Sequence, residues 1–250
     1  LQMKYNISYS KPCYSKYDKK KILNYVTDLD QNWFGEFKET RKLEENLSKV
    51  SGANYVHAVN SGTSALICAF LSLGLKKNDE VLMTGYNHIA TPNTAKLLNL
   101  KIRVVDIEKE NSFADFNLIK KNINKKIKCL VLAAINGRVS DSIFNICKFA
   151  KSKKIPIIID GASALGSYKN NKQILSLGDI TTTSFSTSKL ISSGQGGAIF
   201  TNSKSIYDKI KPLKNFGRLK STDERFSIYG LNFKMSDALS VLANSQLEQL

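Results

Sequence analysis

The chain has 250 residues, 42% of them hydrophobic, which is typical of a folded globular protein and excludes an intrinsically disordered one. Its longest apolar stretch, 65–75, is shorter than the roughly 20 residues of a membrane span, and its first residues carry no secretion signal, so we expect a cytoplasmic protein without a membrane partner. The net charge of +16 suggests a nucleic-acid binder or an enzyme for anionic substrates, but scattered lysines without interleaved aromatic residues favour a general richness in lysine and no nucleic-acid partner.

The predicted elements alternate between helices and strands. In chain order we expect a helix over 37–51, a strand over 55–59, a helix over 62–73, strand 80–83, helix 91–98, strands 102–106 and 128–135, helix 142–151, strands 155–160, 180–184 and 198–201, and helices 205–213 and 235–250. This alternation favours an α/β domain with a largely parallel sheet, whose ligands bind beyond the carboxyl ends of the strands. We expect 1–52 to form an N-terminal segment and helix, and 53–250 to form the large domain.

The cysteines and histidines do not predict a metal site. The four cysteines lie far apart without a CxxC pair, and the only histidines are His57 and His88. A disulfide framework is equally unexpected, and free thiols of a reducing compartment fit better.

A possible phosphate site follows the strand 55–59. Gly62, Thr63 and Ser64 open a helix there, where backbone N–H groups without helical partners can hold a phosphate and hydroxyl groups can add further bonds. The alternative is an ordinary Ser/Thr cap of the helix.

An acidic side chain, Asp160, ends the most hydrophobic strand. It is either a helix cap or a functional acid. A buried aspartate needs a cationic partner, and the protonated nitrogen of a pyridine ring is one such partner.

Lys189 lies in a loop rich in hydroxyl groups that follows the strand 180–184 and precedes the glycines of 194–197. Such a lysine is usually a surface residue, but it can also form a Schiff base, with Ser184 adding a hydroxyl for a phosphate. A lone histidine such as His88 is usually structural; here it follows the strand 80–83, where its flat ring can stack on a cofactor.

Together, in this order, these segments resemble the DegT/DnrJ/EryC1/StrS family of sugar aminotransferases from about Trp33 onwards. The resemblance is densest in the segments 59–66, 156–166, 176–180, 184–197 and 230–237. It implies the large domain of the pyridoxal-phosphate (PLP) transferase fold type I, a mostly parallel seven-stranded sheet with helices on both faces. It also implies that the small C-terminal domain of the family is absent from this chain.

The resemblance assigns roles to the residues around the cofactor ring. Lys189 would bind PLP as a Schiff base and shuttle protons, Asp160 would pair with the ring nitrogen, and His88 would stack on the ring. Ser163 stands where the family usually has Gln or His beside the ring hydroxyl, which leaves the tuning of the ring open.

The resemblance also assigns the phosphate contacts. Gly62, Thr63, Ser64 and Ser184 would bind the phosphate within one subunit. Asn232 resembles the asparagine that reaches the phosphate of the neighbouring subunit. The implied assembly is a homodimer with shared active sites.

The implied activity is PLP-dependent transfer of an amino group from an amino acid, with glutamate as the expected donor, to a nucleotide-linked keto-sugar in polysaccharide biosynthesis. One alternative is a nucleotide-sugar 3-dehydratase of the same family; some of these carry His in place of the lysine, so Lys189 argues against it. A second alternative is a regulatory protein that binds PLP without turnover. A third, a nucleic-acid binder, has only the charge in its favour.

Overall fold

The computed structural model describes residues 11–28, 34–220 and 222–250. Residues 1–10, where we predict no secretion signal, and Trp33, where the family resemblance begins, lie outside the described residues. The main sheet consists of β1 (Tyr55–Val59), β2 (Glu80–Thr84), β3 (Lys101–Val105), β4 (Ile127–Ala133), β5 (Ile157–Asp160), β8 (Ile180–Ser184) and β9 (Gly197–Thr201). A small hairpin is formed by β6 (Tyr168–Lys169) and β7 (Lys172–Gln173).

The seven strands lie in the order β1-β9-β8-β5-β4-β2-β3. From β8 to β3 all neighbours are parallel, whereas β9 runs antiparallel to both β1 and β8. The mostly parallel seven-stranded sheet that the resemblance implies is therefore confirmed.

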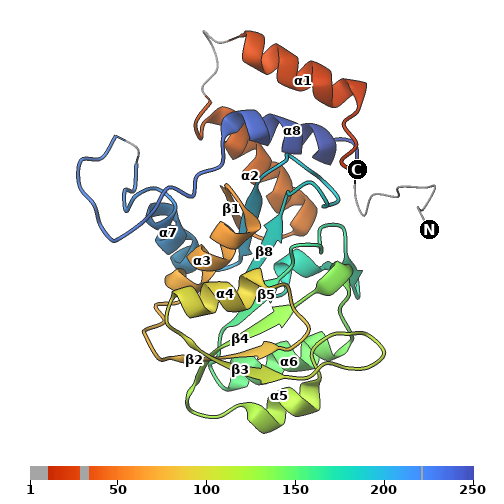
Figure 1. The fold of residues 1–250 in the computed structure, drawn as a ribbon, viewed down its shortest axis with the longest axis vertical. Helices are drawn as coiled ribbons and strands as arrows, with labels where there is room; N and C mark the ends of the chain where they lie inside the picture. The colour runs from red at the N-terminus through yellow and green to blue at the C-terminus, as the bar shows by residue number, and fades with distance from the viewer. Residues whose placement is uncertain (1–10, 29–33, 221) are drawn as a thin grey trace, which may run out of the picture.

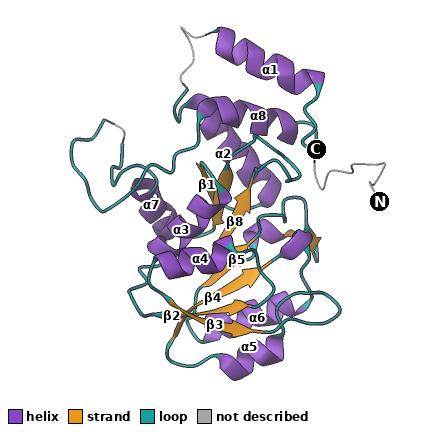
Figure 2. Cartoon of the chain, viewed as in Figure 1, coloured by secondary structure: helices purple, strands orange, loops and turns teal. Residues whose placement is uncertain are grey.

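Helices cover both faces of this sheet (Figures 1 and 2). They are α1 (Lys16–Thr27), α2 (Lys38–Ser51), α3 (Gly62–Ser72), α4 (Ala90–Leu97), α5 (Phe116–Asn122), α6 (Ser142–Ser152), α7 (Lys204–Leu213) and α8 (Asp237–Leu247), with short 3₁₀ turns at Ile135–Gly137 and Ile174–Ser176. Alternate strand residues point to opposite faces. Ile158 packs in the cluster that contains α3, α4 and α7, whereas Ile157 and Ile159 pack with α2, α5, α6 and α8.

The sequence pattern missed elements that lack an apolar stripe. In α1 only Asp18 and Tyr25 are buried, so this helix has no stripe of buried apolar residues at helical spacing from which it could be predicted. The strand expected over 128–135 ends at Ala133, because the chain turns into a 3₁₀ segment in which Asn136 has a left-handed φ of 53°. Within the described residues, every helix is too short or too polar to cross a bilayer.

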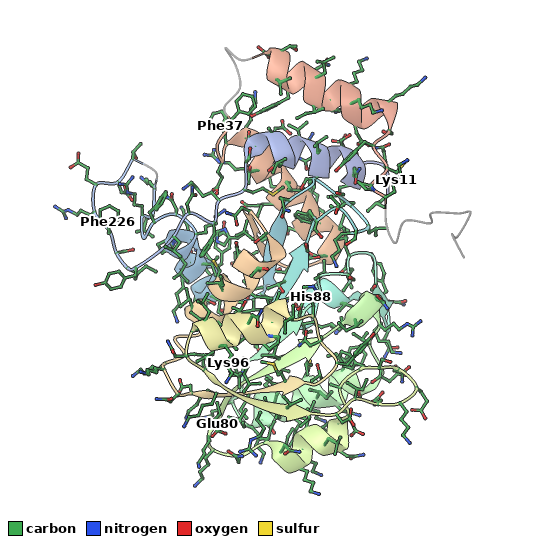
Figure 3. The ribbon with its side chains drawn as sticks, viewed as in Figure 1. Lys11, Phe37, Glu80, His88, Lys96 and Phe226 are labelled. Carbon is green, nitrogen blue, oxygen red and sulfur yellow. The ribbon has the colours of Figure 1, made fainter. Side chains whose placement is uncertain are left out.

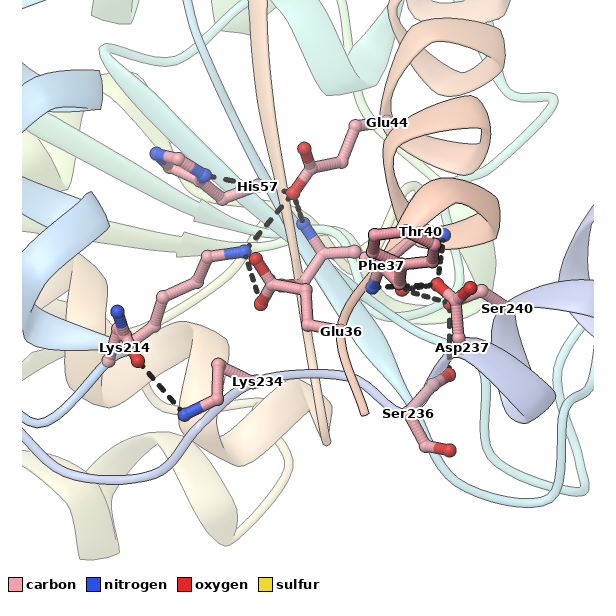
Figure 4. Close-up of polar contacts among 12 residues, drawn as sticks. Glu36, Phe37, Thr40, Glu44, His57, Lys214, Lys234, Ser236, Asp237 and Ser240 are labelled. Atoms are coloured by element: carbon pink, nitrogen blue, oxygen red, sulfur yellow. Dashed lines mark hydrogen bonds and ion pairs between the residues drawn. The ribbon is translucent and has the colours of Figure 1, made fainter. Parts of the chain in front are cut away.

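One carboxylate joins the start of α2 to the start of α8 (Figure 4). Asp237 is fully buried, and its side chain accepts hydrogen bonds from the backbone N–H groups of Phe37 (3.0 Å), Glu39 (3.1 Å) and Thr40 (2.7 Å) and from the hydroxyl of Tyr25 (3.1 Å). The first helical N–H groups have no partner within their own helix, and Phe37 brings no capping side chain. Asp237 therefore caps α2 from a distant part of the chain.

A buried group of charges joins α2 to β1 and α7 (Figure 4). The ammonium of Lys214 lies 3.0 Å from Glu36 and 3.2 Å from Glu44, and it donates to the carbonyl of Ala58 at 3.1 Å. Burial raises the pKa of Glu44, but Lys214 and His57 outweigh it and lower that pKa to about 2. Because the folded-state pKa is depressed, the stabilisation by Glu44 is present above its ordinary value and is lost only as the pH falls towards 2.

Candidate active site

Residues at the carboxyl ends of several strands line one cavity of about 580 Å³. The predicted site residues among them are Gly62, Thr63, His88, Asp160, Ser163, Ser184 and Lys189. The edge of the sheet thus brings together residues that lie far apart in the sequence, from Gly62 to Lys189. Ser64 and Asn232 are not among the lining residues.

The start of α3 provides donors to this cavity. Ser61 caps the helix by accepting a hydrogen bond from the N–H of Ser64 at 3.0 Å, and the buried hydroxyl of Ser64 donates to Asn60 Oδ1 at 2.6 Å. Ser64 is thus engaged inside the cap, whereas Gly62 and the exposed Thr63 line the cavity. The N–H groups of these first two helical residues have no partner within the helix, which makes the end of α3 a suitable place for an anion.

Close backbone packing fixes the start of α3 against β8 and β9. A Cβ atom on Gly197 would lie only 2.7 Å from the backbone nitrogen of Gly62 and from the carbonyl oxygen of Thr183. A Cβ atom on Gly62 would lie 3.0 Å from Cβ of Ser184 and 3.4 Å from its hydroxyl oxygen. Glycine at both positions therefore brings the hydroxyl of Ser184 next to the helix start.

Asp160 is buried and oriented by its neighbours. The fully buried Thr91 donates to Asp160 Oδ2 at 2.5 Å, and the backbone N–H of Ala162 donates to Oδ1 at 3.2 Å. No cation of the described residues lies within ion-pair distance of Asp160, although a buried carboxylate is costly without a positive partner. The carboxylate is therefore suited to a cationic group of a ligand in the cavity.

The amine of Lys189 donates to the hydroxyl of Ser163 at 3.0 Å. Its loop begins after β8 and is tightened by a hydrogen bond from the N–H of Lys189 to the carbonyl of Ser186 at 3.0 Å. Across the described residues no carboxylate forms an ion pair with Lys189. The amine is thus held by a neutral hydroxyl, an environment that does not lock it into a permanent ion pair.

His88 lies two residues before the start of α4 (Figure 3). The ring is exposed, and its Nδ1 accepts a hydrogen bond from the N–H of Ala90 at 3.2 Å. This bond fixes the edge of the ring at the helix start, and the residue lines the cavity.

Three further residues in or beside the cavity were not predicted from the sequence. Asn87 and Asn136 line the cavity, and both amide atoms of Asn87 are buried without a hydrogen-bond partner among the described residues. Thr91 reaches Asp160 from the first turn of α4. Asn87 and Asn136 could have been predicted, because each closely follows a strand. The contact of Thr91 with Asp160 could not, because it depends on how two non-adjacent strands are placed in the sheet.

Asn232 lies on the surface, outside the cavity. Its backbone carbonyl accepts a hydrogen bond from Asn60 Nδ2 at 3.1 Å, so its segment runs beside the loop that leads into α3. Its side chain is exposed.

Comparison with known proteins places the chain among similar sequences and folds. A model of the DegT/DnrJ/EryC1/StrS aminotransferase family matches residues 16–250. GDP-perosamine synthase of Escherichia coli O157:H7 is 30% identical over 227 residues, which cover 90% of this chain and 62% of that protein. The dTDP-4-amino-4,6-dideoxy-D-glucose transaminase of Shigella dysenteriae is 34% identical over 210 residues, covering 84% of this chain and 56% of that protein.

Among solved structures, Helicobacter pylori PseC, an aminotransferase involved in the biosynthesis of pseudoaminic acid, matches with a TM-score of 0.89 at 25% identity. The match covers 98% of this chain and 66% of that one. It confirms the fold type I architecture. The chain spans about six tenths of the length of the curated relatives it matches.

Proposed function

Since this chain belongs to the DegT/DnrJ/EryC1/StrS aminotransferase family, we propose that it binds PLP in the large cavity and transfers an amino group to a nucleotide-linked keto-sugar. This proposal rests on three groups that lie in one cavity. They are a lysine amine, a buried carboxylate without a cationic partner among the described residues, and a helix start whose first N–H groups have no partner within the helix. Each alone is common, but together they match the aldehyde, the ring nitrogen and the phosphate of PLP.

The residues present fit this cofactor. The phosphate would be held by the N–H groups at the start of α3 and by the hydroxyls of Thr63 and Ser184. Asp160 would hold a proton on the ring nitrogen, and His88 would stack on the ring. When bound, PLP supplies an electron sink for breaking and forming bonds at the carbon next to the amine.

Lys189 has two tasks in this proposal. Its amine would hold the cofactor covalently, and when free it would move a proton at the carbon atom next to the transferred amine. Ser163 accepts the hydrogen bond that keeps the amine inside the cavity between these tasks. Thr91 donates to the carboxylate of Asp160 and so keeps it in one orientation, in which it would pair with the ring nitrogen.

The substrate is proposed from the relatives. The names of two of them refer to sugars carried by GDP and dTDP, and a diphosphate-linked sugar suits a protein with a charge of +16. The expected donor is glutamate. The presence of Lys189 in the cavity favours amine transfer over the related 3-dehydration.

An amine-transfer assay tests this function. The purified protein is incubated with PLP, glutamate and each of a panel of nucleotide-linked 4-keto and 3-keto sugars, and the products are identified by mass spectrometry. We expect one sugar to gain an amino group, and we expect no product without PLP. PLP bound at Lys189 without any transfer across the panel would contradict the proposed activity and favour a regulatory PLP-binding protein.

We further propose that two subunits share each active site. Asn232 lies outside the cavity of its own chain, and its exposed amide is a suitable phosphate donor because it adds no charge. In a two-fold dimer the same contact occurs twice, so each site would receive one Asn232 from the neighbouring subunit.

Mixing two inactive variants tests the shared site. Lys189→Ala and Asn232→Asp should each be inactive alone, while a mixed dimer contains one site with both defects and one intact site. We expect recovery of up to about one working site per mixed dimer. Absence of recovery, once subunit exchange is demonstrated by mass spectrometry, would mean that Asn232 does not serve the neighbouring site.

A further inference from the structure

The loop of residues 186–193, which carries Lys189, is held by a side chain of α8. Gln246 Oε1 accepts a hydrogen bond from the backbone N–H of Ser192 at 2.6 Å, and Gln246 Nε2 donates to the carbonyl of Cys13 at 3.1 Å. One amide thus joins the lysine loop, helix α8 and the segment that precedes α1. These three parts are brought together only by the tertiary fold.

Ser192 is the residue through which hydrogen bonds connect the loop to the rest of the protein. It is only 3% exposed, its hydroxyl accepts a hydrogen bond from the N–H of Gly194 at 3.2 Å, and the same hydroxyl pairs with the hydroxyl of Tyr14 at 3.2 Å. The next residue, Ser193, donates its N–H to the carbonyl of Phe185 at 3.0 Å and so closes the base of the loop. The contacts of Ser192 with Gln246 and Tyr14 come from outside this closed loop.

Lys189 borders two separate cavities. Besides the large cavity it lines a smaller one of about 210 Å³, whose wall includes Cys13, Ser192 and Gln246. The side chain of Lys189 therefore has space available away from Asp160. Among the described residues, its amine is held in the large cavity by one hydrogen bond, to Ser163. The hydrogen bonds of Ser192 restrict the backbone of the loop from which the side chain of Lys189 extends.

We propose that Gln246 is a positioning residue, which holds the loop 186–193 so that the amine of Lys189 is directed into the large cavity. This inference rests on the proposed function, because it assigns Gln246 to the residue that binds PLP. Gln246 itself does not line the large cavity and is not a catalytic residue.

The test compares three variants of the protein. Gln246→Leu removes both hydrogen bonds at similar volume, and Gln246→Glu keeps an acceptor for the N–H of Ser192. Gln249→Leu is the matched control, because Gln249 lies three residues further along and bonds to Asp18 (2.9 Å) and Ser245 (2.8 Å) instead of the loop. The measurements are hydrogen exchange of the cofactor-free protein, the rate of PLP attachment at Lys189 after borohydride trapping, and the pH titration of the visible absorbance of bound PLP.

We expect Gln246→Leu to speed exchange within 186–193 and to slow PLP attachment, each by about tenfold, and to shift the midpoint of the absorbance titration. Gln246→Glu should recover most of these values, and Gln249→Leu should leave them unchanged. Wild-type values in Gln246→Leu, or equal changes in Gln249→Leu, would overturn the positioning role. Attachment of PLP to another lysine of the wild-type protein would instead overturn the proposed function, and this inference with it.

Discussion

Replacement of Lys189 by arginine is expected to lower amine transfer at least about a thousandfold while the fold is retained. Arginine preserves the positive charge and much of the length, but its guanidinium stays protonated and is no substitute for a neutral amine that forms a covalent bond and moves a proton. The hydroxyl of Ser163, which accepts from the lysine, remains available to the arginine, so little structural change is expected.

Two measurements check this result. PLP is fixed with borohydride and mapped by mass spectrometry in the wild-type protein, and turnover is measured in Lys189→Arg. Lys172→Arg is the matched control, because Lys172 is the exposed first residue of strand β7, and this variant should behave as wild type. An adduct at a lysine other than Lys189 would refute the assignment.

The Asp160→Asn variant is expected to slow amine transfer by about a hundredfold or more. The substitution hardly changes the volume, and the remaining oxygen can still accept from Thr91, so the fold should persist. What is lost is the negative charge that favours the protonated ring nitrogen and with it the electron sink. Asp160→Glu should also be slow, because one additional methylene displaces the carboxylate in a packed site.

Single-turnover rates with bound PLP, combined with thermal unfolding, separate chemistry from stability. Asp106→Asn is the matched control: Asp106 also follows a strand, but its carboxylate accepts from the N–H of Ile107 and does not line the cavity. A near-normal rate in Asp160→Asn, with the cofactor bound, would remove Asp160 from the proposed mechanism.

The sheet could be predicted because its strands are short apolar runs between turn residues. The segment 157–160 is buried on both faces, and a strand buried in this way is typically a continuous apolar run in the sequence. The positions of Asp160 and Lys189 could also be predicted, since Asp160 ends one strand and Lys189 follows another, and the carboxyl ends of these two parallel strands meet at one edge of the sheet.

Contacts made by polar residues across long separations were not predictable. Helix α1 is fastened by Asp18, whose carboxylate accepts from Ser245 at 2.6 Å and from Gln249 at 2.9 Å. Burial raises the pKa of Asp18, but these hydrogen bonds and those from Ser15 outweigh it and leave the pKa below its usual value. Neither the contacts that hold α1 nor the contact of Gln246 with the lysine loop produces a periodic pattern in the sequence, because each depends on single polar side chains.

The capping of α2 by Asp237 also sets an order of events during synthesis. Thr40 and Asp237 are 197 residues apart, so at about 5 to 20 residues per second the ribosome adds the capping carboxylate about 10 to 40 seconds after Thr40. During that interval Leu43 and Leu47 of α2 have no α8 to pack beside, although both are fully buried in the finished core. The nascent chain thus exposes this apolar surface of α2 until α8 has been made, and during that period a chaperone has the most apolar surface to protect.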